Sequence, residues 1–150
     1  MRSYRREVVT HLSPREAWSY LADFTTTNEW DPRAVDTVRV EGDGDVGTRY
    51  ECDVRFLGRR THMAYRITRL DPGRRIEWTG ENEFVTAHDT IELHEDPSGV
   101  TTVDYTAAFD YPKVPRPLGR LFRLPLERLC DEARDGLQET LRRRFPHEAA

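Results

Sequence analysis

The chain has 150 residues, of which 37% are hydrophobic, 10% aromatic and 33% charged, and its formal net charge is −4. A chain of this length fits one domain, over residues 1–150, that can bury a core without disulfides or a structural metal. Its aromatic content argues against disorder. The acidic balance argues against nucleic acid as a partner, because no overall positive field would attract a polyanion.

Cysteine and histidine spacing argue against a metal centre. Cys52 and Cys130 lie far apart and form no CxxC pair, so neither a disulfide framework nor a zinc site is expected. The histidines lack the spacing of metal ligands; they are His11, His62, His88, His94 and His147. We therefore predict no metal and no cofactor.

No apolar stretch approaches the ~20 residues that a membrane-spanning helix needs. We therefore expect a cytoplasmic protein without stable membrane insertion, present as a monomer or a homodimer.

The first predicted elements are a strand at residues 4–12 and a short amphipathic helix from Pro14 to about Phe24. Ser13 can cap this helix, Pro14 suits its first position, and Glu16 can complete a capping box.

Residues 25–32 are typical of a second cap followed by a short helical turn or loop. Asp31-Pro32 should end this segment, because the residue before a proline resists helical geometry.

From there to about Asp110, turn residues separate about six segments in which apolar and polar residues alternate. The clearest apolar faces consist of Tyr50, Cys52, Val54 and Phe56; Met63, Tyr65 and Ile67; and Val103, Tyr105, Ala107 and Phe109. One apolar and one charged face are typical of an antiparallel sheet with one side in water.

The last predicted element is a long amphipathic helix after the prolines at 112, 115 and 117. Pro125 should either kink this helix or start its second piece. The predicted apolar stripe consists of Leu118, Leu121, Phe122, Leu126, Leu129, Cys130, Ala133, Leu137 and Leu141. One helix covers such a sheet only if the sheet curls around it, which predicts an α+β fold with a curved antiparallel sheet of about seven strands.

Four stretches of the sequence carry a family resemblance. They are Ser13-Pro14-x-Glu16-x-Trp18 with Leu21 and Asp23; Trp30-Asp31-Pro32; Ala87-x-Asp89-Thr90-Ile91; and Thr101-Thr102-Val103-x-Tyr105, followed by a helix with Ala133 and Gly136-Leu137. In these the chain resembles the polyketide cyclase/dehydrase-type members of the SRPBCC superfamily, which share the helix-grip fold of START and birch-pollen-allergen domains. The resemblance implies a deep pocket between sheet and long helix. It supplies no catalytic motif, since the superfamily includes carriers, cyclases, hydrolases and partner-binding modules.

Asp89 is the most informative polar residue of the predicted sheet. If Ile91 and Leu93 face the core, strand periodicity places Asp89 on the same inner face. A carboxylate there needs partners or a shifted pKa. It could orient a ligand hydroxyl or act as a general acid/base, or it could be a structural residue bonded to backbone, Tyr65 or Tyr105.

Aromatic residues supply the other candidates for ligand contact. Tyr50, Tyr65 and Tyr105 should face the interior with Trp78 beside them, and such amphipathic rings suit a polycyclic or lipid-like ligand, although each could equally pack as ordinary core. Trp30 could cap the mouth of a cavity or pin its loop to the sheet. The predicted ligand-binding set is Trp30, Tyr50, Val54, Tyr65, Trp78, Asp89, Tyr105, Phe122, Leu126 and Cys130.

Three functions fit these patterns. The first is binding of an apolar small molecule, lipid-like or aromatic polyketide-like, between sheet and helix. The second is a polyketide aromatase/cyclase, which needs a shaped cavity and acid/base groups such as Asp89, so whether the chain is an enzyme stays open. The third is a protein-interaction module without a small ligand, which predicts a largely filled cavity and an exposed apolar patch elsewhere.

Overall fold

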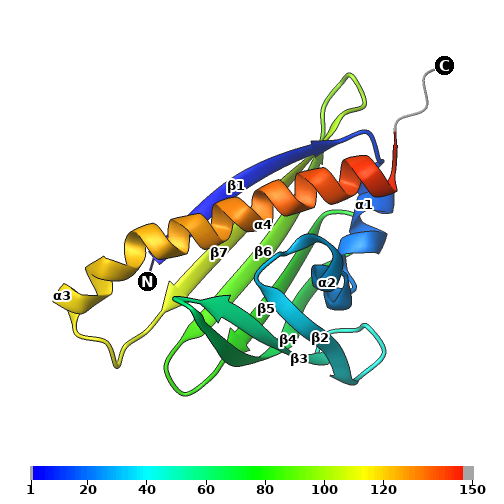
Figure 1. The fold of residues 1–150 in the computed structure, drawn as a ribbon. Helices are drawn as coiled ribbons and strands as arrows, with labels where there is room; N and C mark the ends of the chain where they lie inside the picture. The colour runs from blue at the N-terminus through cyan, green and yellow to red at the C-terminus, as the bar shows by residue number, and fades with distance from the viewer. Residues whose placement is uncertain (1, 147–150) are drawn as a thin grey trace.

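Seven strands form one antiparallel sheet in the order β1-β7-β6-β5-β4-β3-β2, and the sheet curves around a long helix (Figure 1). The computed structural model describes residues 2–146, so the ends of the predicted domain and His147 lie outside the described residues. The strands are β1 (Arg2–Thr10), β2 (Ala34–Glu41), β3 (Arg49–Phe56), β4 (Arg59–Asp71), β5 (Arg75–Glu81), β6 (Thr86–Glu95) and β7 (Thr101–Asp110).

Three short helical segments connect β1 to β2: α1 (Pro14–Leu21), η1 (Phe24–Thr26) and α2 (Thr27–Trp30). The predicted capping box is confirmed. The Ser13 hydroxyl accepts from the Glu16 N–H at 3.1 Å, and the Glu16 carboxylate accepts from the Ser13 N–H at 3.0 Å. As predicted, the second helical segment ends before Asp31.

The C-terminal helical region consists of α3 (Arg116–Gly119), η2 (Arg120–Phe122) and α4 (Arg123–Arg144). Pro125 is the third residue of α4, where its missing N–H would have had no partner within the helix. Of the two roles predicted for Pro125, the start of a second helical piece is therefore the one observed. α4 then runs along the concave face of the sheet (Figure 1).

The predicted apolar stripe is wrong at its N-terminal end. Leu118 and Leu121 are exposed, and the buried stripe on α4 starts only at Leu126. The reason is that α3 projects past the end of the sheet, where no strand is present to cover it (Figure 1).

A close contact holds α2 against α4. A Cβ atom added to Gly136 would lie 2.0 Å from the carbonyl oxygen of Trp30, so only glycine allows this approach. The Arg33 guanidinium, just after α2, donates two hydrogen bonds to the Glu132 carboxylate on α4, one of them at 3.2 Å. Together these contacts fix the position of the α2–β2 connection beside the long helix.

Candidate ligand-binding cavity

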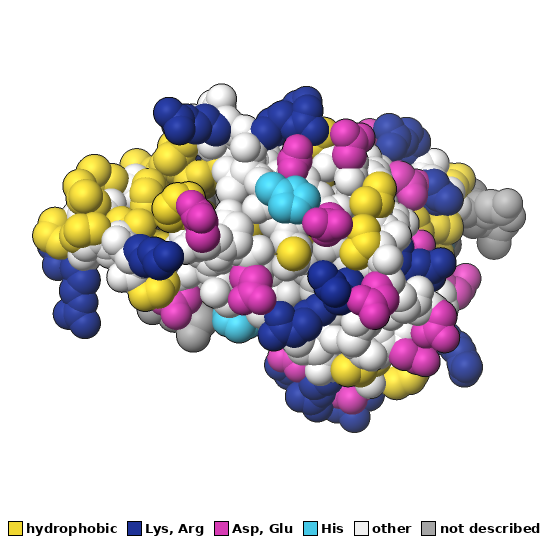
Figure 2. Space-filling model, turned by 90° about the horizontal axis from the view of Figure 1, so that it is seen from below, with side chains coloured by type: hydrophobic (Ala, Val, Ile, Leu, Met, Phe, Trp, Pro, Cys, Tyr) yellow, Lys and Arg dark blue, Asp and Glu magenta, His cyan; other side chains and the backbone are white. Residues whose placement is uncertain are grey.

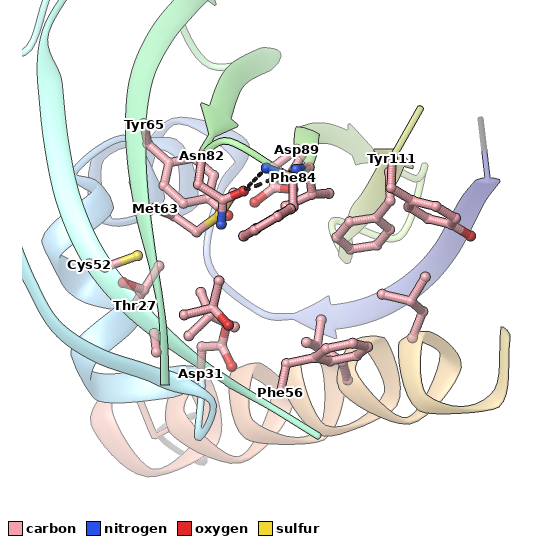
Figure 3. A pocket seen from close by; sticks show the side chains of 18 of the residues that line it. Thr27, Asp31, Cys52, Phe56, Met63, Tyr65, Asn82, Phe84, Asp89 and Tyr111 are labelled. Carbon is pink, nitrogen blue, oxygen red and sulfur yellow. Dashed lines mark hydrogen bonds between the residues drawn. The ribbon is translucent and has the colours of Figure 1, made fainter. Parts of the chain in front are cut away.

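A cavity of about 350 Å³ lies between the concave face of the sheet and the N-terminal half of α4 (Figure 3). Its apolar lining consists of Phe24, Trp30, Ala34, Val54, Phe56, Met63, Phe84, Val85, Ala87, Phe109, Val114, Phe122, Leu126 and Leu129. The other lining residues are Thr27, Asp31, Cys52, Thr61, Tyr65, Asn82, Asp89, Tyr105 and Tyr111. A mostly apolar wall with a few polar groups is typical of small-molecule pockets.

The structure brings seven of the ten predicted ligand-binding residues to the cavity wall: Trp30, Val54, Tyr65, Asp89, Tyr105, Phe122 and Leu126. The other three, Tyr50, Trp78 and Cys130, are buried but do not line the cavity. The Phe24 ring explains two of these absences. Its centroid lies 5.5 Å from that of Tyr50 and 5.1 Å from that of Trp78, and Phe24 itself lines the cavity.

Several wall residues were missed from the sequence. Phe56 and Met63 share strand faces with Val54 and Tyr65, so the alternation contained the signal needed to include them. Asp31 carried no such periodic signal: it stood out as a helix-ending residue before proline and as part of the Trp30-Asp31-Pro32 stretch.

Asp31 reaches the cavity from the end of α2. Its carboxylate accepts a hydrogen bond from the Arg33 N–H at 2.9 Å, and its side chain is half-buried. Burial raises the pKa of Asp31 to about 6, although the hydrogen bond from the Arg33 backbone and the Arg33 charge oppose the shift. With a pKa of about 6, most of the Asp31 carboxyl groups are ionised at pH 7.

Asp89 lies on the opposite wall, in β6, between its cross-strand partners Trp78 and Ala107 (Figure 3). Its exposed fraction is 7%, and parity with Ile91 places it on the inner face as predicted. Burial, followed by the charge of Asp31, raises the pKa of Asp89 to about 7, while a hydrogen bond from the Tyr105 hydroxyl lowers it. The cavity thus contains two carboxyl groups that titrate near neutral pH.

Tyr65 and Tyr105 supply neutral hydroxyls to the same space. Burial raises the pKa of both well above the ordinary tyrosine value, so both keep their protons and can donate hydrogen bonds. Gly80, the cross-strand partner of Tyr65, makes room for its ring, because a Cβ there would lie 2.3 Å from a ring carbon.

Trp30 lies in the wall and is buried, away from the exposed residues that surround the opening. Its indole N–H donates to the Thr26 hydroxyl at 3.2 Å, and its ring meets that of Tyr105 edge-to-face at 6.0 Å. The first contact holds α2 to η1, and the second packs α2 against β7 of the sheet.

The cavity opens at the end where α3 begins. Phe84 lines the cavity and is also exposed. Its loop is held by the Asn82 side chain, which accepts from the N–H groups of Phe84 and Val85 at 2.8 and 3.0 Å (Figure 3). Opposite this loop, the Phe122 ring contacts those of Phe56 and Tyr111, at centroid distances of 6.2 and 5.5 Å.

Within residues 2–146, no group of three or more His, Cys, Asp or Glu side chains is placed to hold a metal ion. None of the helices in this range is long and apolar enough to cross a membrane.

These features define a helix-grip protein with an apolar cavity that contains two titratable carboxyl groups. The sequence model of the family described as polyketide cyclase/dehydrase and lipid transport matches residues 1–142. The chain belongs to this family, and both the resemblance noted in the sequence and the predicted fold class are confirmed.

Solved structures with the same fold include a Thermus thermophilus protein, with a TM-score of 0.80 and 15% identity over 96% of this chain and 99% of that chain. The Zhui aromatase/cyclase from a Streptomyces species has a TM-score of 0.79 and 16% identity over 99% of each chain. A START superfamily protein from Mycobacterium smegmatis has a TM-score of 0.68 and 16% identity over 95% of each chain. At these identities the likeness shows the fold alone. A comparison with curated proteins finds no match.

Proposed function

We propose that the chain binds one apolar small molecule, lipid-like or aromatic polyketide-like, in the cavity between sheet and α4. The lining of this cavity carries the proposal: its wall is mostly aromatic and aliphatic, and its volume of about 350 Å³ suits a compact ligand. The description of the family, which includes lipid transport, supports the same reading. An open cavity of this size argues against an interaction module with a filled interior.

The polar groups of the wall would orient the ligand. Asp89 in its protonated form and the Tyr65 hydroxyl are hydrogen-bond donors in a mostly apolar wall, while the Tyr105 hydroxyl already donates to Asp89. Such donors pair with a ligand carbonyl or hydroxyl, which gives a ligand with either group an advantage over one without.

Titration with the neutral fluorescent probe 1-aminoanthracene tests the cavity directly. Val54 lines the cavity, so Val54→Trp should fill part of it and weaken probe binding by about tenfold or more, the loss expected when a few buried apolar contacts are removed. Val38→Trp is the matched control, because Val38 is exposed on β2 and does not line the cavity. Equal affinity in the wild type and in Val54→Trp would refute the proposed site.

A second candidate function, a polyketide aromatase/cyclase, is favoured by the two carboxyl groups. In an aldol closure, a base removes a proton from the carbon next to a carbonyl, a new carbon–carbon bond forms, and an acid protonates the oxygen of the attacked carbonyl. With pKa values of about 6 and about 7, Asp31 would be the base and Asp89 the acid.

Mass analysis of a bound poly-β-ketone thioester after incubation separates the two functions. A carrier returns the compound unchanged, whereas a cyclase converts it, and conversion should then fall in Asp31→Asn and Asp89→Asn. Conversion at the wild-type rate in both variants would remove the two carboxyl groups from the mechanism.

A further inference from the structure

Five large apolar side chains surround the mouth of the cavity and point into solvent. They are Leu57 (56% exposed), Phe84 (59%), Leu118 (52%), Leu121 (70%) and Leu124 (67%), and we call this set the mouth rim. In the described part of the chain, the large hydrophobic side chains exposed elsewhere are all valines. The exposed leucines and the exposed phenylalanine of this part of the chain therefore all belong to the mouth rim.

Three separate segments contribute to the mouth rim: the β3–β4 turn, the β5–β6 loop and the region from α3 to the start of α4. Figure 1 shows these segments at the same end of the molecule, far from the C-terminus. The ring contact between Phe56 and Phe122 joins the first segment to the third, and Phe84 and Phe122 line the same opening. Figure 2 shows the resulting cluster of hydrophobic side chains at the α3 end, with basic side chains beside it.

Leu57 is held in a strained conformation at the tip of the β3–β4 turn. Its φ angle is 53° and that of Gly58 is 74°, the pattern of a two-residue turn that favours asparagine followed by glycine. A leucine is disfavoured in this left-handed region, and it is also exposed here. Strain of this kind persists mainly at functional positions, which indicates that the exposed leucine has a role outside folding.

The α3 side of the mouth rim is basic, whereas the β5–β6 loop carries one acid, Glu83, beside Phe84. Residues 111–125 contain Lys113, Arg116, Arg120 and Arg123 but no acidic residue, although the formal net charge of the chain is −4. Within residues 2–146, Arg123 alone of these four is in an ion pair, with Glu127 at 3.7 Å. The other three cations are exposed and available to an external anion.

We infer that the mouth rim is a docking surface for a lipid bilayer that contains anionic headgroups. A short helical segment with leucines on one side and arginines beside them lies in the bilayer interface, with its apolar side chains among the acyl chains. The basic side chains add attraction to anionic headgroups, which salt weakens. A second copy of the chain fits less well, because two positively charged rims repel each other. Docked in this way, the cavity opens toward the acyl chains, so an apolar ligand passes between bilayer and cavity without crossing water.

Flotation of the full-length protein with vesicles tests this inference. We expect binding to mixed phosphatidylcholine–phosphatidylglycerol vesicles, weaker binding to pure phosphatidylcholine vesicles, and loss of binding as salt is added. Leu121→Gln should weaken binding about tenfold, through lost apolar insertion. Arg120→Ser should weaken it about fivefold, through lost attraction to the headgroups.

Leu57→Asn gives the sharpest result, because asparagine suits the turn and should leave the fold intact or more stable. Weaker vesicle binding by this variant therefore reports lost lipid contact and not misfolding. Val46→Gln, in the exposed β2–β3 connection, is the control and should bind like the wild type. The cavity variant Val54→Trp should also bind vesicles normally, so failure of ligand binding and failure of docking are distinguishable.

Absence of binding to the mixed vesicles, or binding that Leu57→Asn and Leu121→Gln leave unchanged, would overturn the inference. A dimer in sedimentation velocity that these variants dissociate would assign the mouth rim to a second copy of the chain and would equally overturn it.

Discussion

Asp89 is a carboxyl group in a mostly apolar wall, and its position makes the stability of the protein depend on pH. Burial raises its pKa to about 7, compared with ~3.9 for an aspartate in an unfolded chain. At a pH between these two pKa values, Asp89 keeps its proton in the folded state but has released it in the unfolded state. The free energy of unfolding should therefore fall as the pH rises from about 4 to about 7, with the penalty absent below the lower value and complete above the higher one.

Replacing Asp89 by asparagine should remove the Asp89 part of this slope and leave the part that Asp31 contributes at lower pH, since burial raises the pKa of Asp31 to about 6. We expect Asp89→Asn to be more stable than the wild type at pH 8 by roughly 2–4 kcal/mol, since each unit of pKa shift corresponds to ~1.4 kcal/mol. Urea unfolding at pH 5, 6, 7 and 8 measures the effect. A wild-type stability that does not fall between pH 6 and 8, or an unchanged slope over that interval in the variant, would contradict the assignment of Asp89 as a buried titrating group.

The two carboxyl groups also show how far single residues could be predicted. Asp89 was found from the sequence because strand parity is a local rule that links it to Ile91 and Leu93. Asp31 was not found, because its place at the wall depends on the contact between Trp30 and Gly136, more than a hundred residues apart in the chain. No local pattern encodes that contact.

At the scale of elements, alternation and capping predicted most of the architecture. The capping box and the six strands after it follow from short-range rules of periodicity and turn chemistry. The error at Leu118 and Leu121 has a different origin, because the apolar pattern continues past the place where the sheet ends. A stripe on a helix predicts what could be buried, but burial also requires a partner surface.

The approach of α2 to α4 leads to a prediction at this same scale. Gly136→Ala should destabilise the protein by about 1–3 kcal/mol, because the added methyl group meets the backbone carbonyl of Trp30, which cannot move without shifting α2. Alanine favours a helix over glycine by ~1 kcal/mol, so a net loss would show that the contact outweighs helix propensity. Urea unfolding measures it, with Glu139→Ala on the exposed face of α4 as the control. A Gly136→Ala variant as stable as the wild type would contradict this prediction, because it would mean that α2 can shift away from the added methyl group at no cost in stability.

At the scale of the whole molecule, the fold leaves space that its own side chains do not fill. Period-two and period-3.6 patterns predict which faces turn inward. They do not predict the cavity volume, which depends on the curvature of all seven strands and on the summed size of side chains from many elements. Phe24 illustrates this, since its ring covers Tyr50 and Trp78 and so decides which predicted residues reach the cavity.

An unfilled core should make the stability of the whole domain respond to its ligand. A ligand that binds only the folded state adds about 2.7 kcal/mol to the free energy of unfolding at a free concentration a hundred times its Kd. For a chain of this size, that gain should raise Tm by about 5–10 °C. Thermal unfolding with increasing 1-aminoanthracene measures the shift, which should be small in Val54→Trp and of wild-type size in Val38→Trp. A shift of the same size in Val54→Trp would place the bound probe outside the cavity, on another part of the folded surface.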